Sequence, residues 1–395
     1  MRLHLINFLK THPFFVNLAW GLVRLLLRIW GLFVPIRPKT MLFSSFGGRN
    51  IDDSPGAIYQ EICKRPEFSD WTLIWALVDP DKFKLPRGEK VKIDTPAFFH
   101  ALLFSRVWVS NSGMDRGIGL RRRGTLYVET WHGSSLKKAC GEENQNAIGG
   151  KWHARHKGAL DDRTIRCAQS ELDRDNYQRV FHTTKESILL CGAPRNDSLF
   201  RYTDSEIKAI RRRLRIPENK QVILYAPTYR EYLFDEHREM CLAPPMDLTK
   251  WERLLGDQYV LLIRAHYGVS AALKLKENEF VRDVSKYACL NDLYIITDVL
   301  ISDYSSTYID YSILDRPIFC FAYDFEEFSE KRGFYWNLEE KLPCPLDRNE
   351  DALLEHILTM DREKCVQATR AFHQEFAPYA GHASEVIVDE ICNRL

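Results

Sequence analysis

The chain has 395 residues, 45% of them hydrophobic and 28% charged, which is too long for one ordinary core and predicts two domains. Its 55 basic residues nearly balance 54 acidic residues, for a formal net charge of +1. This balance excludes the global basic field that drives nucleic-acid binding, so we predict no nucleic-acid partner. The ten cysteines form no C-x-x-C pair, which fits reduced core residues of a cytosolic protein better than disulfides or a zinc site.

The first predicted element is an apolar helix from Phe14 to Val34, long enough to just span a bilayer. Small and polar residues recur along one of its faces: Asn17, Gly21, Arg24, Arg28 and Gly31. Arginines in mid-span are costly in hydrocarbon but tolerated at an interface, so we expect residues 1–37 to lie on the membrane, with Trp20, Trp30 and the leucines in lipid. Arg37 and Lys39 suit an anionic cytoplasmic surface. The alternative is a helix packed on the protein's own core.

Short apolar runs then alternate with helical segments, the rhythm of a doubly wound sheet. For the first domain, residues 38–187, we predict strands and two intervening helices: Met41–Phe46, Thr72–Leu77, Val107–Asn111 and Leu126–Thr130, with helices near Pro55–Lys64 and Pro96–Phe104. For the second domain, residues 188–382, we predict a further series of strands: Ile188–Cys191, Val222–Tyr225, Tyr259–Ile263, Val299–Ser302 and Ile318–Ala322. The boundary is placed near Ser187.

Two basic regions of the predicted first domain carry no regular pattern. The segment from Lys137 to Arg166 reads as an irregular loop that closes on substrate or touches membrane phosphates. Its His153 and His156 have no carboxylate or cysteine partner at a metal-binding spacing, so we interpret them as loop histidines. The run from Arg121 to Arg123 reads as a solvated turn, with lipid headgroups as the alternative neighbour.

The stretch from Asp298 to Asp324 predicts one β-α-β unit with a hydroxyl-rich turn between its first strand and its helix. Such a turn is where open parallel sheets bind anions, and Ser305, Ser306 and Thr307 supply hydroxyl donors there. Asp310, one turn into the helix, is placed to accept a hydrogen bond from a ribose hydroxyl. In the alternative interpretation Ser306 is an ordinary N-cap, and Thr307 with Asp310 forms an imperfect capping box.

Motifs from residue 46 to residue 335 occur in an order that resembles the CDP-glycerol glycerophosphotransferase family of teichoic-acid and capsule enzymes. They are Phe46-Gly47-Gly48 with Asp53-Ser54-Pro55, Thr130-Trp131-His132-Gly133 with Leu136-Lys137-Lys138, Gly192 to Asp197, Ala226 to Arg230, Arg264-Ala265-His266, the stretch from Asp298, and Arg332 to Tyr335. The resemblance implies an α/β fold of two Rossmann-like domains facing a cleft, like the GT-B glycosyltransferases. It also implies that the last helix, 383–395, returns to the first domain.

The same resemblance implies a role for each candidate residue. His132 would be the general base and His266 would stabilise phosphate oxygens, since a histidine titrating near neutral pH suits either task. The residues that would hold the donor are Thr228, Arg230, Ser305, Ser306 and Thr307 on the pyrophosphate, Arg264 as a weaker addition, and Asp310 on the ribose. Four further residues are possible cleft residues: Gly133, which lets backbone approach; Arg195 and Asp197, which orient the cleft or pair to close a turn; and Asp303, which orients a histidine or begins the turn.

The reaction implied is in-line attack by an acceptor hydroxyl on the β-phosphorus of CDP-glycerol, with release of CMP. The chain has no G-x-x-x-x-G-K-[ST] loop, and we predict no metal and no cofactor, with arginine, histidine and a helix N-terminus neutralising charge. The expected acceptor is an undecaprenyl-type lipid-linked saccharide or a growing poly(alditol phosphate), and the expected location is peripheral, at the cytoplasmic face of the cell membrane.

Three alternatives stay open for the function. The donor could be CDP-ribitol. The protein could be a nucleotide-sugar glycosyltransferase of the same architecture, or a catalytically silent membrane scaffold. A scaffold has no need of the combined set formed by His132, His266, Arg230 and Ser305–Thr307, which favours an enzyme.

Overall fold

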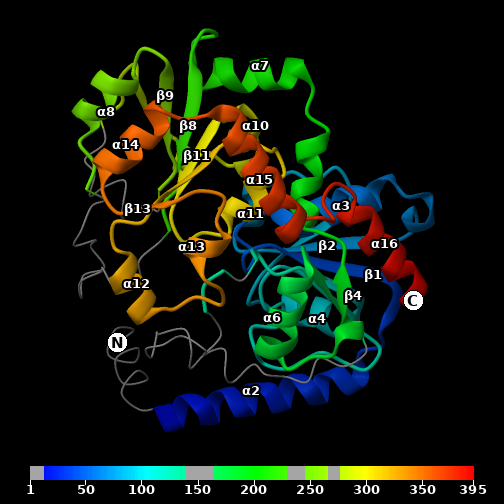
Figure 1. The fold of residues 1–395 in the computed structure, drawn as a ribbon. Coiled ribbons are helices and arrows are strands. Elements are labelled where there is room, and N and C mark those ends of the chain that lie inside the picture. Colours follow the sequence, from blue (N-terminus) through cyan, green and yellow to red (C-terminus); the bar gives the residue numbers. More distant parts are fainter. Residues whose placement is uncertain (1–12, 135, 139–162, 229–244, 266–275) are drawn as a thin grey trace, which may run out of the picture.

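The computed structural model of the protein describes residues 13–134, 136–138, 163–228, 245–265 and 276–395. Two parallel β-sheets, each with its own helices, form a first half and a second half of the molecule (Figure 1). The strand orders are β3-β2-β1-β4-β5-β6-β7 and β10-β9-β8-β11-β12-β13. Both contain the 3-2-1-4-5-6 order of a doubly wound sheet, which places the ligand-binding edge where the strand order reverses. The predicted α/β class with parallel sheets is confirmed.

The first half is built on the seven-stranded sheet. Its strands are β1 (Arg37–Ser44), β2 (Thr72–Leu77), β3 (Glu89–Lys92), β4 (Ser105–Ser110), β5 (Leu126–Glu129), β6 (Thr164–Ala168) and β7 (Ile188–Leu190). Its helices are α2 (Pro13–Phe33), α3 (Asp53–Lys64), α4 (Pro96–Phe104), α6 (Glu171–Phe181) and the last helix α16 (Ala383–Arg394), with short 3₁₀ turns η1 (Pro66–Phe68), η2 (Pro80–Lys82), η3 (Lys185–Ser187) and η4 (Pro194–Phe200).

The second half is built on the six-stranded sheet. Its strands are β8 (Gln221–Tyr225), β9 (Tyr259–Ile263), β10 (Val281–Asp283), β11 (Val299–Ser302), β12 (Ile318–Phe321) and β13 (Leu346–Asp347). Its helices are α7 (Asp204–Arg213), α8 (Leu248–Leu255), α10 (Leu290–Ile296), α11 (Thr307–Ser312), α12 (Phe325–Lys331), α13 (Leu338–Lys341), α14 (Glu350–Leu358) and α15 (Arg362–Phe376).

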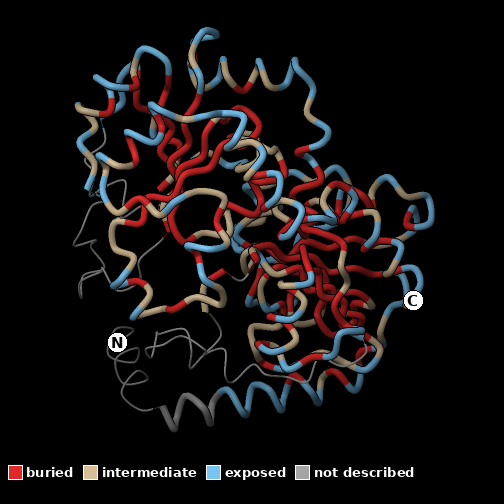
Figure 2. The backbone as a smooth tube through the Cα atoms, in the orientation of Figure 1, coloured by how far each residue is buried: buried red, intermediate tan, exposed pale blue. Residues whose placement is uncertain are grey.

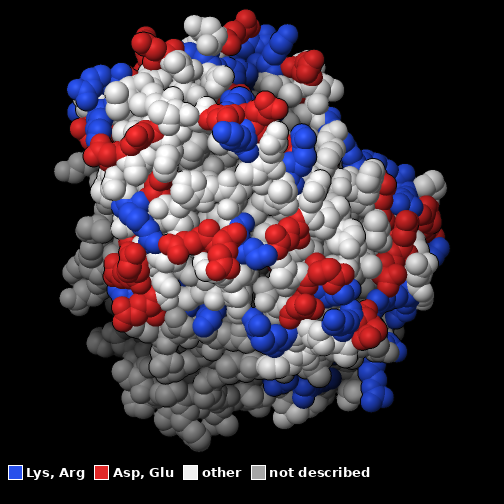
Figure 3. Space-filling model, in the orientation of Figure 1, with Lys and Arg blue, Asp and Glu red and all other residues white. Residues whose placement is uncertain are grey.

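The central strands are apolar throughout because both faces of each sheet are covered. In β1, Met41 and Phe43 pack with α3 and α16, while Leu42 between them packs with α2 and α4 on the opposite face. In the second sheet, Leu224 and Ile223 likewise belong to the cores on opposite faces. Figure 2 shows the buried chain concentrated in these two sheets. The surface seen in Figure 3 mixes lysine and arginine with aspartate and glutamate, as the near-neutral composition requires.

The pairing of β7 corrects the predicted boundary at Ser187. Arg166, Cys167 and Ala168 of β6 pair with Ile188, Leu189 and Leu190, so β7 is the last strand of the first sheet. The second sheet begins only with β8. A strand's sheet is set by the neighbour with which it hydrogen-bonds, and the short apolar run at Ile188 carries no information about that neighbour.

The last helix lies on the first half, where Ile387 and Ile391 join the core of the first sheet (Figure 1). Asp197 in η4 fixes the start of α16. Its two carboxylate oxygens accept hydrogen bonds from the backbone N–H groups of Ala383 (3.0 Å) and Ser384 (2.8 Å). A buried carboxylate at this position satisfies N–H groups that have no partner inside the helix.

One side of α2 packs on the protein, and the other is exposed. Leu27 and Val34 are buried in the first half, and Trp30 stacks on His100 with ring centroids 5.6 Å apart. The expectation that Trp30 dips into lipid is therefore wrong, because its indole is used for packing. Arg122 donates to the carbonyl oxygens of Val34 and Leu103, so this arginine caps the end of the helix and is not in a solvated turn. No described helix is both long and apolar enough to cross a membrane.

Candidate active site

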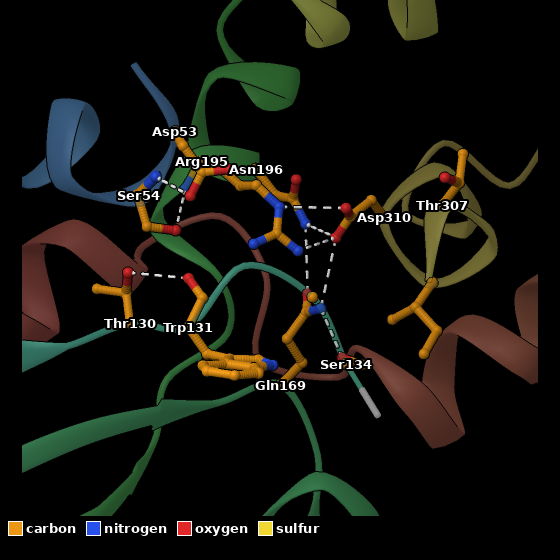
Figure 4. Close-up of polar contacts among 12 residues, drawn as sticks. Asp53, Ser54, Thr130, Trp131, Ser134, Gln169, Arg195, Asn196, Thr307 and Asp310 are labelled. Carbon is orange, nitrogen blue, oxygen red and sulfur yellow. Dashed lines mark hydrogen bonds and ion pairs between the residues drawn. The ribbon is translucent and has the colours of Figure 1, made fainter. Parts of the chain in front are cut away.

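The loops that follow several strands of the two sheets meet at the junction between the halves (Figure 4). The loop after β5 carries His132 and Gly133, and the loop after β11 carries Ser305 and Ser306. These two loops touch: a Cβ atom added at Gly133 would lie 2.5 Å from Ser306 Oγ. Glycine is therefore required at residue 133 for the close approach, as the sequence predicted. The structure brings the predicted base and the predicted donor-binding hydroxyls together.

His132 is held by one ring nitrogen, and the other has no hydrogen-bond partner among the residues that the structure describes. Nδ1 lies 3.0 Å from the backbone oxygen of Asn111, which can only accept, so Nδ1 carries the proton. The neutral ring therefore has its lone pair on Nε2, the form that a general base requires. The ring is exposed and lies beside two aromatic side chains, Trp131 at 4.4 Å and Phe46 at 6.2 Å between ring centroids.

The surroundings of His132 favour its neutral form. Enclosure by protein atoms lowers the pKa of His132 below its ordinary value and outweighs the hydrogen bond to Asn111 and the charges of Asp53 and Glu129, which act to raise it. The positive charge of Arg195 also lowers the pKa. At neutral pH the ring is ready to accept a proton.

Asn111 connects several parts of the site. Its side chain is completely buried, with Oδ1 accepting from the N–H of Phe46 (2.8 Å) and Nδ2 donating to Ser45 Oγ (3.3 Å) and Asp53 Oδ1 (3.0 Å). Its backbone oxygen holds His132. Asn111, which follows β4 directly, thus holds the loop after β1, the start of α3 and the ring of His132. From the sequence, Asn111 is expected only as the last residue of a strand.

Arg195 and Asp310 join the two halves by an ion pair. Arg195 Nη2 lies 2.9 Å from Asp310 Oδ1 and Nε lies 3.1 Å from Oδ2, a two-point contact between side chains that are 11% and 7% exposed. Asn196 Nδ2 and Gln169 Nε2 also donate to Asp310 Oδ1, at 2.7 and 3.4 Å. Figure 4 shows this network at the centre of the junction. Asp310 is thus engaged by protein donors, and its predicted contact with a ribose stays a prediction.

Burial alone would lower the pKa of Arg195, but the charges of Asp310 and Asp53 and the hydrogen bond to Asp310 raise it overall. Arg195 therefore remains a cation. The alternative in which Arg195 pairs with Asp197 is wrong, because Arg195 binds Asp310 and both oxygens of Asp197 hold α16. A role for Asp197 in orienting the cleft stays a prediction.

The turn before α11 is organised differently from an ordinary N-cap. Ser306 has helical backbone angles and makes no capping hydrogen bond. Ser305 Oγ instead accepts from the N–H of Thr307 at 3.2 Å and lies 2.6 Å from Thr307 Oγ1. The capping-box alternative for Thr307 and Asp310 is therefore wrong, since Asp310 binds Arg195. Ser305, Ser306 and Thr307 are all partly exposed at the junction.

Asp303 shapes the second-half side of the site through backbone contacts. Its Oδ1 accepts from the N–H groups of Thr228 (2.8 Å) and Tyr304 (2.6 Å), so it ties the loop after β8 to the turn after β11. Of its two predicted roles, beginning the turn is the one that these contacts support. Arg264, after β9, donates from Nη1 to the carbonyl oxygen of Tyr287 at 2.6 Å, and burial lowers its pKa.

Two predicted site residues, His266 and Arg230, lie outside the described residues, as do His153 and His156. Within the part of the chain that the structure describes, no group of three or more His, Cys, Asp or Glu side chains could hold a metal ion. The sequence indicates no role for Asn111 or Gln169, and it places Asn196 and Asp53 within motifs without a role of their own. Each of these acts through a tertiary contact that local spacing does not reveal.

Comparison with known proteins places this geometry in a family. A family model described as CDP-Glycerol:Poly(glycerophosphate) glycerophosphotransferase matches residues 27–393. The teichoic acid poly(glycerol phosphate) polymerase of Staphylococcus epidermidis is 35% identical over 90% of this chain, which spans 51% of that protein. The teichoic acid glycerol-phosphate transferase of Staphylococcus aureus is 31% identical over 88% of this chain and 92% of its own length.

A solved structure of the wall teichoic acid polymerase TagF superimposes with a TM-score of 0.84 at 30% identity, covering 100% of this chain and 98% of that one. A histidine variant of TagF soaked with CDPG gives a TM-score of 0.83 at 32% identity, covering 99% of this chain and 98% of the other. The chain therefore belongs to the CDP-glycerol:poly(glycerophosphate) glycerophosphotransferase family.

Proposed function

We propose that this protein transfers glycerol phosphate from CDP-glycerol to an acceptor hydroxyl in teichoic acid synthesis and releases CMP. The observation that carries the proposal is the placement of His132, whose Nδ1 is bound to the Asn111 carbonyl and whose neighbour Gly133 touches Ser306 of the other half. A base on one half thus faces hydroxyl groups on the other. Family membership supplies the donor class, since the family is described by CDP-glycerol.

The reaction follows from this placement. Nε2 of His132 takes the proton of an acceptor hydroxyl while that oxygen attacks the β-phosphorus of CDP-glycerol. The new P–O bond forms as the bond to CMP breaks, so glycerol phosphate moves to the acceptor and CMP leaves. A positioned general base of this kind contributes roughly 10²- to 10⁴-fold to the rate.

The donor would lie against the loops of the second half. Hydroxyl groups of Ser305, Ser306 and Thr307 and the backbone near Thr228 would bind the pyrophosphate, with Arg264 as a nearby cation. Asp303 holds two of these loops together. His266 and Arg230 stay proposals from family resemblance. CDP-ribitol is the second candidate donor, and the relatives named above favour glycerol by their names.

The acceptor would be a lipid-linked saccharide or a growing polymer, with the protein bound peripherally to the cytoplasmic face of the cell membrane. Support comes from α2, whose outward side is apolar: Leu22, Leu25, Leu26, Ile29, Leu32 and Phe33 are 45–79% exposed. Such a surface on a long helix suits the boundary between headgroups and acyl chains. Arg28 lies on another side, where it contacts the oxygen of Gly119.

The test compares His132→Gln with His382→Gln, a control whose side chain is 77% exposed at the start of α16. We expect His132→Gln to lose at least about 100-fold in acceptor-dependent CMP release while binding CDP-glycerol about as well as the original protein. The control should keep both properties. Near-normal transfer by His132→Gln would remove this residue from the role of base.

A further inference from the structure

Strained backbone is concentrated around His132. Phe46, Asp53 and Trp131 have φ angles of 47°, 56° and 54°, in the left-handed region that residues other than glycine rarely adopt. The ring of Phe46 and the ring of Trp131 both adjoin His132, and the N–H of Phe46 and the carboxylate of Asp53 are both bound by Asn111. Strain of this kind persists only where the surroundings impose it, and it gathers at functional sites.

Asp53 is the charged member of this group. Its Oδ1 accepts from Asn111 Nδ2 at 3.0 Å and from the N–H of Ser54 at 2.7 Å. Asparagine adopts left-handed angles at least as readily as aspartate, and its side-chain oxygen could accept the same two hydrogen bonds. Backbone conformation and hydrogen bonding therefore do not explain an aspartate at residue 53. What aspartate adds is a negative charge.

Three charged groups act on His132, and they differ in their ion-pair contacts. The groups concerned are Asp53 at the start of α3, Glu129 on β5 and Arg195 in η4. Glu129 is paired with Arg166 at 2.7 Å, and Arg195 is paired with Asp310 at 2.9 Å. Asp53 forms no ion-pair contact with a residue that the structure describes, and Asn111 and Ser54 are neutral donors to it. Its charge also acts on Arg195, whose pKa it raises.

We propose that Asp53 is an electrostatic positioning partner of His132, which it serves by stabilising the imidazolium formed when His132 takes the acceptor proton. Asn111 makes this possible because one residue holds both partners, His132 by its backbone oxygen and Asp53 by its amide. In the transfer step, Nε2 gains the proton, the acceptor oxygen bonds to phosphorus and CMP departs. The ring becomes positive in the same Asn111 network that holds the carboxylate of Asp53, so the pair of opposite charges exists only after proton transfer begins.

The role of Asp53 in the transfer step rests on the proposed function. The effect of Asp53 on the pKa of His132 does not depend on that function. We would therefore titrate His132 by NMR in the full chain with labelled histidine, using His132→Gln to assign the signal. Asp53→Asn should lower the pKa of His132, because removing a negative charge destabilises the imidazolium. Asp53→Gly, which relieves the left-handed φ, should do the same, so either variant is informative if the other folds poorly.

The matched control is Asp94→Asn. Asp94 also has a left-handed φ, of 61°, and it forms an exposed ion pair with Arg116 at 2.7 Å. This substitution should leave the His132 titration unchanged. An unchanged His132 pKa in a folded Asp53→Asn or Asp53→Gly protein would overturn the proposal, whatever the rate of transfer.

Kinetics give the second readout. In Asp53→Asn we expect the acid limb of kcat/KM to move to lower pH and the plateau to fall on the order of 10-fold or more, since a weaker base transfers protons less well. A purely structural role would lower the rate without moving the limb, and that result would also overturn the proposal. If the His132 pKa falls as expected but no CMP is released from CDP-glycerol, the partnership stands and the proposed function fails.

Discussion

Replacing Arg195 by methionine should destabilise the protein strongly. The guanidinium makes two contacts, of 2.9 and 3.1 Å, with the carboxylate of Asp310, whose side chain is only 7% exposed. After Arg195→Met, the buried carboxylate of Asp310 still accepts hydrogen bonds from Asn196 and Gln169 but has lost its cationic partner. Removing one partner of a buried pair costs about 3–5 kcal/mol, mostly from the charge that is left behind.

The assay is equilibrium unfolding in urea, followed by fluorescence, with Arg201→Met as the control. Arg201 pairs with Glu385 at 3.1 Å, but these side chains are 44% and 41% exposed, and exposed pairs contribute about 0–1 kcal/mol. In the double variant Arg195→Met with Asp310→Leu, both charges of this pair are removed. Its loss of stability should therefore be well below the sum of the two single losses. An Arg195→Met protein no less stable than Arg201→Met would refute the view that this pair holds the halves together.

Three further predictions follow from the site and from α2. Gly133→Ala should lower the free energy of unfolding by about 1–3 kcal/mol, because the new methyl group would collide with Ser306 Oγ at 2.5 Å. Adding Ser306→Gly removes the colliding hydroxyl and should restore much of this stability, and no recovery would contradict the contact. The pH at which kcat/KM falls on the acid side should lie below 6.5. Burial lowers the pKa of His132, and activity is lost only where His132 is protonated and cannot accept a proton. A fall in kcat/KM centred above pH 6.5 would contradict this. Leu32→Glu with Phe33→Glu, which changes two side chains each 79% exposed on α2, should abolish binding to anionic vesicles and spare transfer to a soluble acceptor. Leu358→Glu, at a side chain 50% exposed on α14, is the control and should still bind the vesicles.

The strands that the sequence predicted best are those buried on both faces. Thr72–Leu77 and Tyr259–Ile263 have the predicted bounds, because central strands of a parallel sheet need an unbroken apolar run. The edge strand β3, EKVK, has exposed ends and no such run, so it left no signal. β6 was hidden by Arg166, whose charge is buried by pairing with Glu129 and stacking on Phe181. These contacts exist only in the folded protein.

The candidate site divides in the same way. Motifs located His132, Gly133 and Ser306, since each of these residues sits where a strand ends and carries a recognisable pattern. Roles that depend on a distant partner could not be predicted. Asp310 and Arg195 are 115 residues apart in the sequence, and Asp197 is 186 residues from the N–H group of Ala383 that it holds. Local spacing therefore suggested a capping box and an Arg–Asp turn, where the fold instead makes a bridge between halves and a helix cap.

The most direct test of the account is CMP release by the purified protein, given CDP-glycerol together with a lipid-linked saccharide primed with glycerol phosphate. We expect release that depends on both substrates in the original protein and falls at least about 100-fold in His132→Gln, with CDP-ribitol a poor donor. Equal release by both proteins would contradict the assignment of His132 as the base. No release from CDP-glycerol would contradict the proposed reaction itself.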